Sequence, residues 1–90
     1  MSSRLEAIRS RLQAELAPSE VDVIDESHKH VGHAGARDGR GHFAARIVSA
    51  AFEGLPLLAR HRLVYAALGD LMLTDIHALT LKAIAVSERR

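Results

Sequence analysis

The sequence predicts an α+β domain in two layers, with helices packed on one face of a three-stranded sheet. Two stretches repeat apolar residues at helical spacing, and three short stretches show β-branched or alternating apolar residues. The expected order is helix, strand, strand, helix, short helix, strand. Because 90 residues can bury only one modest core, we expect residues 1–90 to form a single domain.

The first helix is expected to begin at Ser2 or Ser3, with Glu6 placed to complete a capping box with Ser3. Its apolar stripe consists of Leu5, Ile8, Leu12 and Leu16. Pro18 ends this helix, since the residue before a proline avoids helical geometry. Residues 21–25 are then expected to form a short strand, because Val and Ile alternate there with Asp.

Residues 27–41 have no hydrophobic period and are rich in glycine and histidine, which predicts an exposed, mobile loop. Residues 43–48 are expected to form the second strand, with Phe43, Ala45 and Ile47 on one face. Two strands joined by such a loop most simply form an antiparallel pair.

The longest helix is expected to follow the turn at Glu53 and Gly54, because Pro56 suits the first position of a helix. Its expected stripe consists of Leu57, His61, Val64, Leu68 and Leu71, reinforced by Leu58, Tyr65 and Met72. This stripe predicts packing against the sheet.

The last part of the chain is expected to hold a short helical turn and one more strand. Thr74 or Asp75 can cap a turn that carries residues 76–77. The strand is expected over residues 79–86, with its odd-numbered positions on one side, and the tail over residues 87–90 is expected to fray.

The composition excludes several classes of function. The chain has no cysteine, which rules out a disulfide scaffold, a cysteine-based zinc site and a thiol nucleophile. It also has no catalytic triad, phosphate-binding loop or dinucleotide fingerprint, so we do not expect an enzyme. The net charge of +1 is too balanced to predict nucleic-acid binding from charge alone.

Nothing in the sequence predicts a membrane or an export signal. The first 12 residues are charged and lack an apolar core like that of a signal peptide, and no apolar run is long enough to span a bilayer. We therefore expect a cytoplasmic protein without a membrane partner.

Histidine is the residue type that points most directly to chemistry. Four histidines fall in one short stretch: His28, His30, His33 and His42. His77 lies far along the chain, and His61 falls on a helical stripe, where a packing role is expected. Neutral imidazole binds zinc, iron and copper. A loop histidine beside a rigidly held His77 would supply two ligands and leave positions open for a partner.

Two alternatives stay open for these histidines. The loop histidines are equally well explained as surface residues, since their spacing matches no closed tetrahedral site. His28, His30 and His33 could also form a zinc site without help from a partner. Beside His61, Arg60 and Arg62 suit contact with phosphate or an acidic partner, although a solvated helix face explains them as well.

Several motifs occur in an order that resembles the BolA family. The first half of the chain carries Val23-Ile24-Asp25-Glu26-Ser27, His30, Gly32-His33-Ala34-Gly35 and Gly41-His42-Phe43. The second half carries Ile47-Val48-Ser49, Phe52-Glu53-Gly54, Arg60-His61-Arg62-Leu63-Val64-Tyr65 and Ile76-His77-Ala78-Leu79. The resemblance covers nearly the whole chain. It implies a class II KH-like fold of α-β-β-α-α-β order with a mixed three-stranded sheet.

The resemblance also implies a partner and a cofactor. BolA-family proteins pair with monothiol glutaredoxins, and such pairs can share a [2Fe-2S] cluster to which the glutaredoxin contributes a cysteine and bound glutathione. The family's histidine before Ala-Leu corresponds to His77, and its variable loop ligand to His33, with His30 as the runner-up. No cofactor is then expected in the isolated chain, which would be a monomer or a weak dimer.

Some family members are described as transcriptional regulators, which implies a second function. The residues that would contact DNA here are Arg60, Arg62 and Lys82. With a net charge near zero, the affinity would be modest and would fall steeply with salt.

Overall fold

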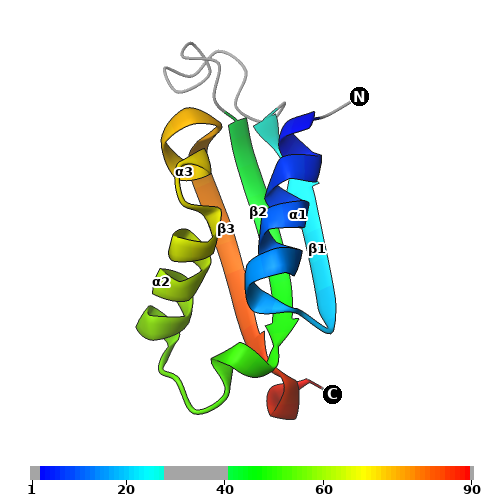
Figure 1. Cartoon of the computed structure of the whole chain (residues 1–90), viewed down its shortest axis with the longest axis vertical. Helices are drawn as coiled ribbons and strands as arrows, with labels where there is room; N and C mark the ends of the chain where they lie inside the picture. Colours follow the sequence, from blue (N-terminus) through cyan, green and yellow to red (C-terminus); the bar gives the residue numbers. More distant parts are fainter. Residues whose placement is uncertain (1–2, 28–40, 90) are drawn as a thin grey trace.

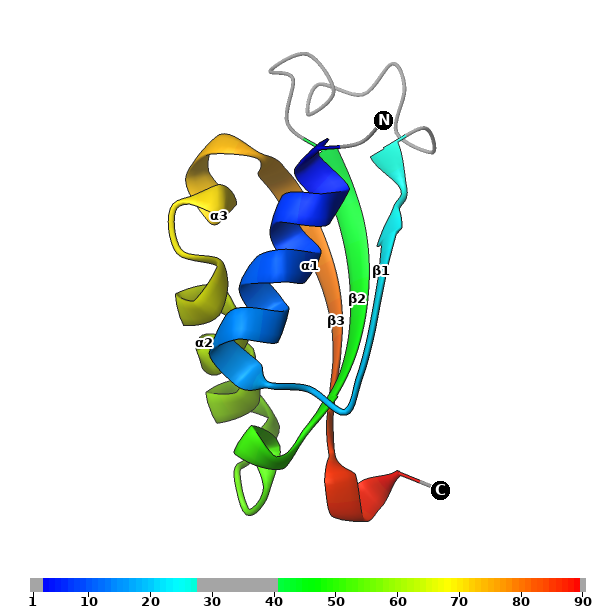
Figure 2. The same ribbon diagram turned by 45° about the vertical axis from the view of Figure 1, so that its right-hand side comes forward.

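The fold is a three-stranded sheet with its helices on one face (Figures 1 and 2). The computed structural model describes residues 3–27 and 41–89. In chain order the elements are α1 (Ser3–Leu16), β1 (Glu20–Asp25), β2 (Gly41–Ser49), the 3₁₀ turn η3 (Ala50–Phe52), α2 (Leu57–Leu68), α3 (Leu71–Thr74), β3 (Ile76–Ala85) and the 3₁₀ turn η4 (Val86–Glu88). The predicted α+β class and the α-β-β-α-α-β order are confirmed.

The sheet is mixed, with β2 at its centre. β1 pairs with β2 in the antiparallel sense, as the sequence predicted, and β2 pairs with β3 in parallel. A parallel pair needs a crossover long enough to return the chain to the same end of the sheet, and α2 and α3 supply it. The crossover therefore brings the first residues of β2 and β3 to the same end of the sheet (Figure 1).

The core lies between the helices and one face of the sheet. The predicted stripe of α1 is buried at Ile8, Leu12 and Leu16, and the predicted inner face of β2 is buried at Phe43, Ala45 and Ile47. Both predictions are confirmed. Figure 2 shows α1 and α2 on one side of the sheet, and none of the α-helices of the described residues lies on the other.

The one buried polar side chain among the described residues is that of Ser49, at the end of β2, and it connects β2 to α1. Ser49 is completely buried; its Oγ donates to the carbonyl of Leu16 (2.7 Å) and accepts from the amide of Ala51 (3.1 Å). Burying a hydroxyl is tolerated here because both of its hydrogen-bonding functions are used.

The predicted stripe of the longest helix is confirmed at Val64 and Leu68, but the prediction is wrong about Leu57, Leu58 and Tyr65 and about where the helix ends. Leu57 and Leu58 are 61% and 63% exposed and Tyr65 is exposed as well, because α2 buries a narrower stripe made of Val64, Ala67 and Leu68. The helix ends at Leu68, where Gly69 adopts a positive φ of 53° and donates to the carbonyl of Tyr65. The predicted extension of the stripe to Leu71 and Met72 belongs to the next element.

The predictions for the last third of the chain also need correction. The short helix is α3, which ends at Thr74 instead of beginning there, so Ile76 and His77 lie on strand β3. The expected fraying of the tail is wrong for its described residues: η4 covers Val86–Glu88 and is held by Glu53, whose carboxylate accepts from the amide and hydroxyl of Ser87. The first helix begins at Ser3, and Gly41, the last residue of the predicted loop, is the first residue of β2. Ser2 and residues 28–40 lie outside what the structure describes.

Candidate functional site

His77 stands at an irregularity in the sheet. Gly41 pairs with Ile76, but the next residue of β2, His42, pairs with Ala78, so His77 is an extra residue in the β2–β3 register. Such a bulge re-aims the side chain of the inserted residue. The His77 side chain is exposed, and its ring centroid lies 5.1 Å from that of His42, with the two rings tilted by 52°.

His42 is held in place by its main chain. Its amide donates to the Oγ of Ser27 (3.0 Å), and its carbonyl accepts from the amide of Glu26 (2.8 Å). Ser27 is itself fixed, because its amide donates to the Oδ1 of Asp25 (2.9 Å). The half-buried His42 ring therefore projects from a well-ordered position on the central strand.

Asp75, the residue before β3, connects the beginning of this strand to β2 and to α1. Its carbonyl accepts from the amide of Gly41 (2.9 Å), and its carboxylate accepts from the hydroxyl of Thr74 (2.5 Å) and from Nε of Arg4 on α1 (3.2 Å). These contacts lower the pKa of Asp75, with the Thr74 hydroxyl as the largest cause. The segment that presents His77 is thus anchored to β2 and α1.

The predicted loop ligands His33 and His30, and their neighbour His28, lie outside the part of the chain that the structure describes. Within residues 3–27 and 41–89, no group of three or more histidine, cysteine, aspartate or glutamate side chains could hold a metal ion. Among the described residues, His77 lies beside His42.

Arg60, one of the residues predicted to bind DNA, is committed to internal contacts. Its guanidinium donates to the carbonyls of Leu55 (2.8 Å) and Ala83 (3.1 Å) and forms a bidentate pair with Glu88 (2.6 and 2.8 Å), leaving the side chain 11% exposed. The pair raises the pKa of Arg60 and lowers that of Glu88 to about 2. Since Glu88 also accepts from the amide of Ala85, the pair covers the edge of β3 near its C-terminal end.

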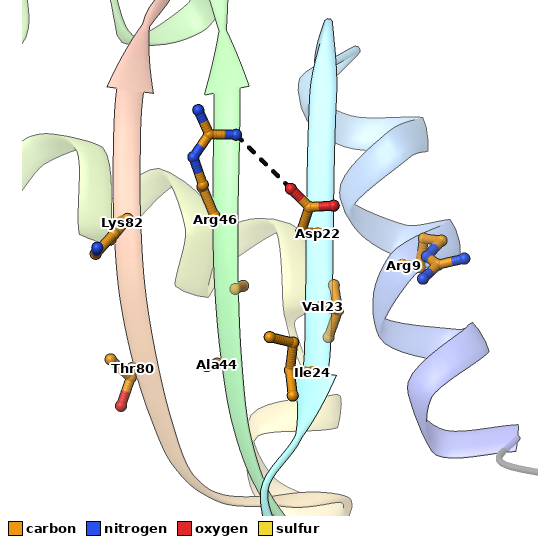
Figure 3. Close-up of a pocket in the computed structure, with 9 residues that line it drawn as sticks. Arg9, Asp22, Val23, Ile24, Ala44, Arg46, Thr80 and Lys82 are labelled. Carbon is orange, nitrogen blue, oxygen red and sulfur yellow. Dashed lines mark ion pairs between the residues drawn. The ribbon is translucent and has the colours of Figure 1, made fainter. Parts of the chain in front are cut away.

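Arg62 and Lys82 do not share a surface with each other. Both are exposed, but Arg62 lies on α2, which covers one face of the sheet, whereas Lys82 lines a hollow on the open face. This hollow of about 460 Å³ is seen in Figure 3. Its lining includes Ile24, Ala44 and Arg46, and Arg46 forms ion pairs with Glu20 (3.0 Å) and Asp22 (3.7 Å).

The sequence from residue 12 to residue 88 matches the family described as BolA-like protein. The chain belongs to the BolA family. The expectation drawn from its motifs is therefore confirmed at the level of the family.

The relatives of this BolA-family chain include plant and bacterial proteins. SufE-like protein 1, chloroplastic/mitochondrial, and protein BOLA1, chloroplastic, both from Arabidopsis thaliana, are 44% and 42% identical over 98% of the chain. The chain spans only 25% and 57% of their respective lengths. The DNA-binding transcriptional regulator BolA of Escherichia coli (strain K12) is 36% identical over 92% of the chain and 76% of its own length.

Solved structures agree with the fold. The BolA domain of SufE1 from Arabidopsis thaliana superposes with a TM-score of 0.86 at 42% identity, covering 99% of each chain. BolA1 from the same plant gives a TM-score of 0.84 at 40% identity over 100% of this chain and 99% of its own. The α+β fold described above is thus that of BolA domains.

The sequence interpretation missed His42 as a partner of His77. It grouped His42 with three loop histidines in one short stretch, just beyond the predicted loop, and His42 is the second residue of β2. Parallel pairing of two strands, one beginning with Gly41-His42 and the other with Ile76-His77, would have placed the two histidines side by side. Arg60 shows the opposite case, in which a cationic motif proves to be part of the internal hydrogen bonding.

Proposed function

We propose that this BolA-family protein is an interaction module that pairs with a monothiol glutaredoxin and contributes histidine ligands to a bridging [2Fe-2S] cluster. The role would be cluster assembly, trafficking or iron regulation, and not enzymatic catalysis. The observation that supports it best is His77, an exposed imidazole whose backbone is anchored through Asp75 at one end of the sheet.

The donor chemistry of the chain fits a shared cluster. Without cysteine, the chain has no thiolate to offer, so the partner must supply the thiolates. In the proposed complex His77 is the fixed ligand, and His33, or else His30, is the second one from the loop. The glutaredoxin provides its cysteine and glutathione. When bound, a cluster with histidine on one iron has a raised reduction potential and a ligand that acid can protonate.

A ligand set of this kind suits transfer or sensing better than permanent storage, because protonation of a histidine weakens its hold on iron. No helix within the described residues could cross a bilayer. The two plant relatives are named for the chloroplast and the mitochondrion, and those locations are not carried over to this chain. We propose that it acts in the cytoplasm, as expected from the sequence.

The test is reconstitution of the pair. The protein would be mixed with a monothiol glutaredoxin, glutathione, iron and sulfide, and the complex isolated by size exclusion and measured by visible absorption and circular dichroism. We expect a coloured heterodimer whose spectrum changes with His77→Ala and not with His61→Ala, a histidine on α2. Failure to form any complex would exclude the proposal.

DNA binding is the second candidate, supported by the name of the Escherichia coli relative. Because Arg60 is engaged internally, the cations available to DNA among the predicted set are Arg62 and Lys82, on opposite faces of the sheet. Contact through α2 predicts that Arg62→Ala weakens binding at low salt and that Lys82→Ala does not. Titration of duplex DNA at two salt concentrations decides this, and equal losses from both variants would refute contact through α2 alone.

A further inference from the structure

The open face of the sheet carries rows of side chains that run across all three strands. In the strand register, Asp22, Arg46 and Lys82 form one such row from β1 through β2 to β3. They alternate along their strands with residues of the inner face, so they lie on the face away from the core, as Figure 3 shows. None of the α-helices of the described residues covers this row.

The row has an available carboxylate at one edge of the sheet and an unpaired ammonium group at the other. Arg46 lies 3.0 Å from Glu20 and 3.7 Å from Asp22, and Glu20 is also paired with Arg89. Asp22 therefore has the longer of the two contacts, and its side chain is 67% exposed. Lys82 is exposed and pairs with no carboxylate of the described residues.

This distribution of charge is complementary to itself. A two-fold axis parallel to β2 would lay β1 of one copy over β3 of another, row on row. Asp22 of each copy would then face Lys82 of the other, so that the same attraction is made twice, as an isologous contact requires. We propose that the open face binds a second copy of this chain, giving a two-fold dimer in which the two sheets pack face to face. An acidic partner protein would satisfy Lys82 alone, whereas a second copy satisfies both charges.

The hollow on the open face fits the same arrangement. The row beside the charged one consists of Ile24, Ala44 and Thr80, and all three line this space of about 460 Å³. Ala44 is small, whereas Ile24 is 58% exposed. Since the axis follows β2, Ile24 of each copy would lie over Thr80 of the other and enter the hollow beside Ala44. Packed sheets lie about 10 Å apart, a gap that two layers of side chains fill.

The dimer should be weak. A face of three strands about 4.8 Å apart buries less than the 1,200–2,000 Å² of a standard interface. The two Arg46 guanidinium groups also approach each other at the axis, although Glu20 and Asp22 hold each one toward its own β1 (Figure 3). The dimer should therefore form only at high protein concentration and weaken with salt. It does not rest on the proposed function, since neither His77 nor a glutaredoxin takes part.

The experiment is sedimentation equilibrium of the full chain at low salt, at protein concentrations up to about 1 mM. The average mass of the parent should rise above that of a monomer as the concentration rises. Lys82→Asp and Asp22→Lys each turn two attractions into two repulsions, so each should raise the dissociation constant about tenfold or more. An equimolar mixture of these two variants should associate again, because each variant supplies the charges that the other lacks.

Two controls complete the test. Arg62→Asp makes the same change of charge on α2, on the other face of the sheet, and should associate as the parent does. Amide NMR shifts of Ile24, Ala44 and Thr80 that change with parent concentration test the surface without any variant. Circular dichroism establishes that each variant is folded. The proposal is overturned if the parent stays monomeric, if either single variant associates as the parent does, if the mixture of folded variants does not associate, or if these amides do not shift.

Discussion

Gly41, which precedes His42 of the candidate site, is the described glycine where an added methyl group would be most crowded. A Cβ on Gly41 would lie 2.6 Å from Cε2 and 2.9 Å from Cζ of Phe43, and 2.8 Å from Oγ of Ser27. Ordinary carbon contacts need about 3.5 Å, so the Phe43 ring would have to move by roughly 1 Å. That ring is 1% exposed and packed in the core, which leaves it little room.

The magnitude follows from overpacking. Forcing extra atoms into a packed core costs about 1–3 kcal/mol, while replacing glycine by alanine stabilises by about 0.4–1 kcal/mol through the unfolded chain. Gly41 is not among the described glycines with positive φ, so backbone strain adds nothing. We therefore expect Gly41→Ala to lower the free energy of unfolding by about 1–2 kcal/mol. For a domain of this size that is a fall in melting temperature of roughly 4–16 °C.

Thermal and urea denaturation followed by far-UV circular dichroism measure this loss. The control is the same substitution in a Phe43→Leu background, where a smaller side chain relieves the clash and Gly41→Ala should cost less than in the parent. Equal losses in both backgrounds, or a Gly41→Ala variant as stable as the parent, would refute the steric argument.

Two further predictions concern the buried hydroxyl and the ion pair at the C-terminal end of the sheet. Ser49→Ala leaves the carbonyl of Leu16 and the amide of Ala51 without their partner, so urea denaturation should show a loss of about 1–3 kcal/mol; an unchanged stability would contradict the role assigned to this hydroxyl. Glu88 has a pKa lowered to about 2 by the Arg60 guanidinium, so its contribution to stability is complete above the ordinary carboxylate value of about 4.3 and is lost as the pH falls toward 2. Thermal melts between pH 2 and 6 should therefore fall more steeply for the parent than for Glu88→Gln, and parallel curves would contradict this.

Local sequence patterns were sufficient to predict the buried faces of α1 and β2. The stripe of α1 and the alternation of β2 each place apolar residues on one side of a regular element, and the core forms on those sides. The pattern of α2 was misleading because Leu57 and Leu58 lie at its first residues, beyond the edge of the sheet-facing stripe. A helical period shows which residues share a face, but not how far the core extends along it.

The candidate site depended on contacts that are distant in the sequence. Thr74 and Asp75 look like helix caps, but Asp75 binds Arg4, 71 residues away, and its carbonyl starts the pairing of β3 with β2. His77 therefore lies in a strand. Its position beside His42 results from the parallel register and its bulge, neither of which has a local sequence signal.

The central claim is that His77 is a ligand that this chain contributes to a cluster shared with a monothiol glutaredoxin. The most direct measurement is the visible circular dichroism spectrum of the reconstituted heterodimer, recorded for the parent and for His77→Ala at equal protein and iron content. We predict that the parent complex has a spectrum distinct from that of the glutaredoxin alone and that His77→Ala abolishes the difference. A His77→Ala complex with the parental spectrum would contradict the claim.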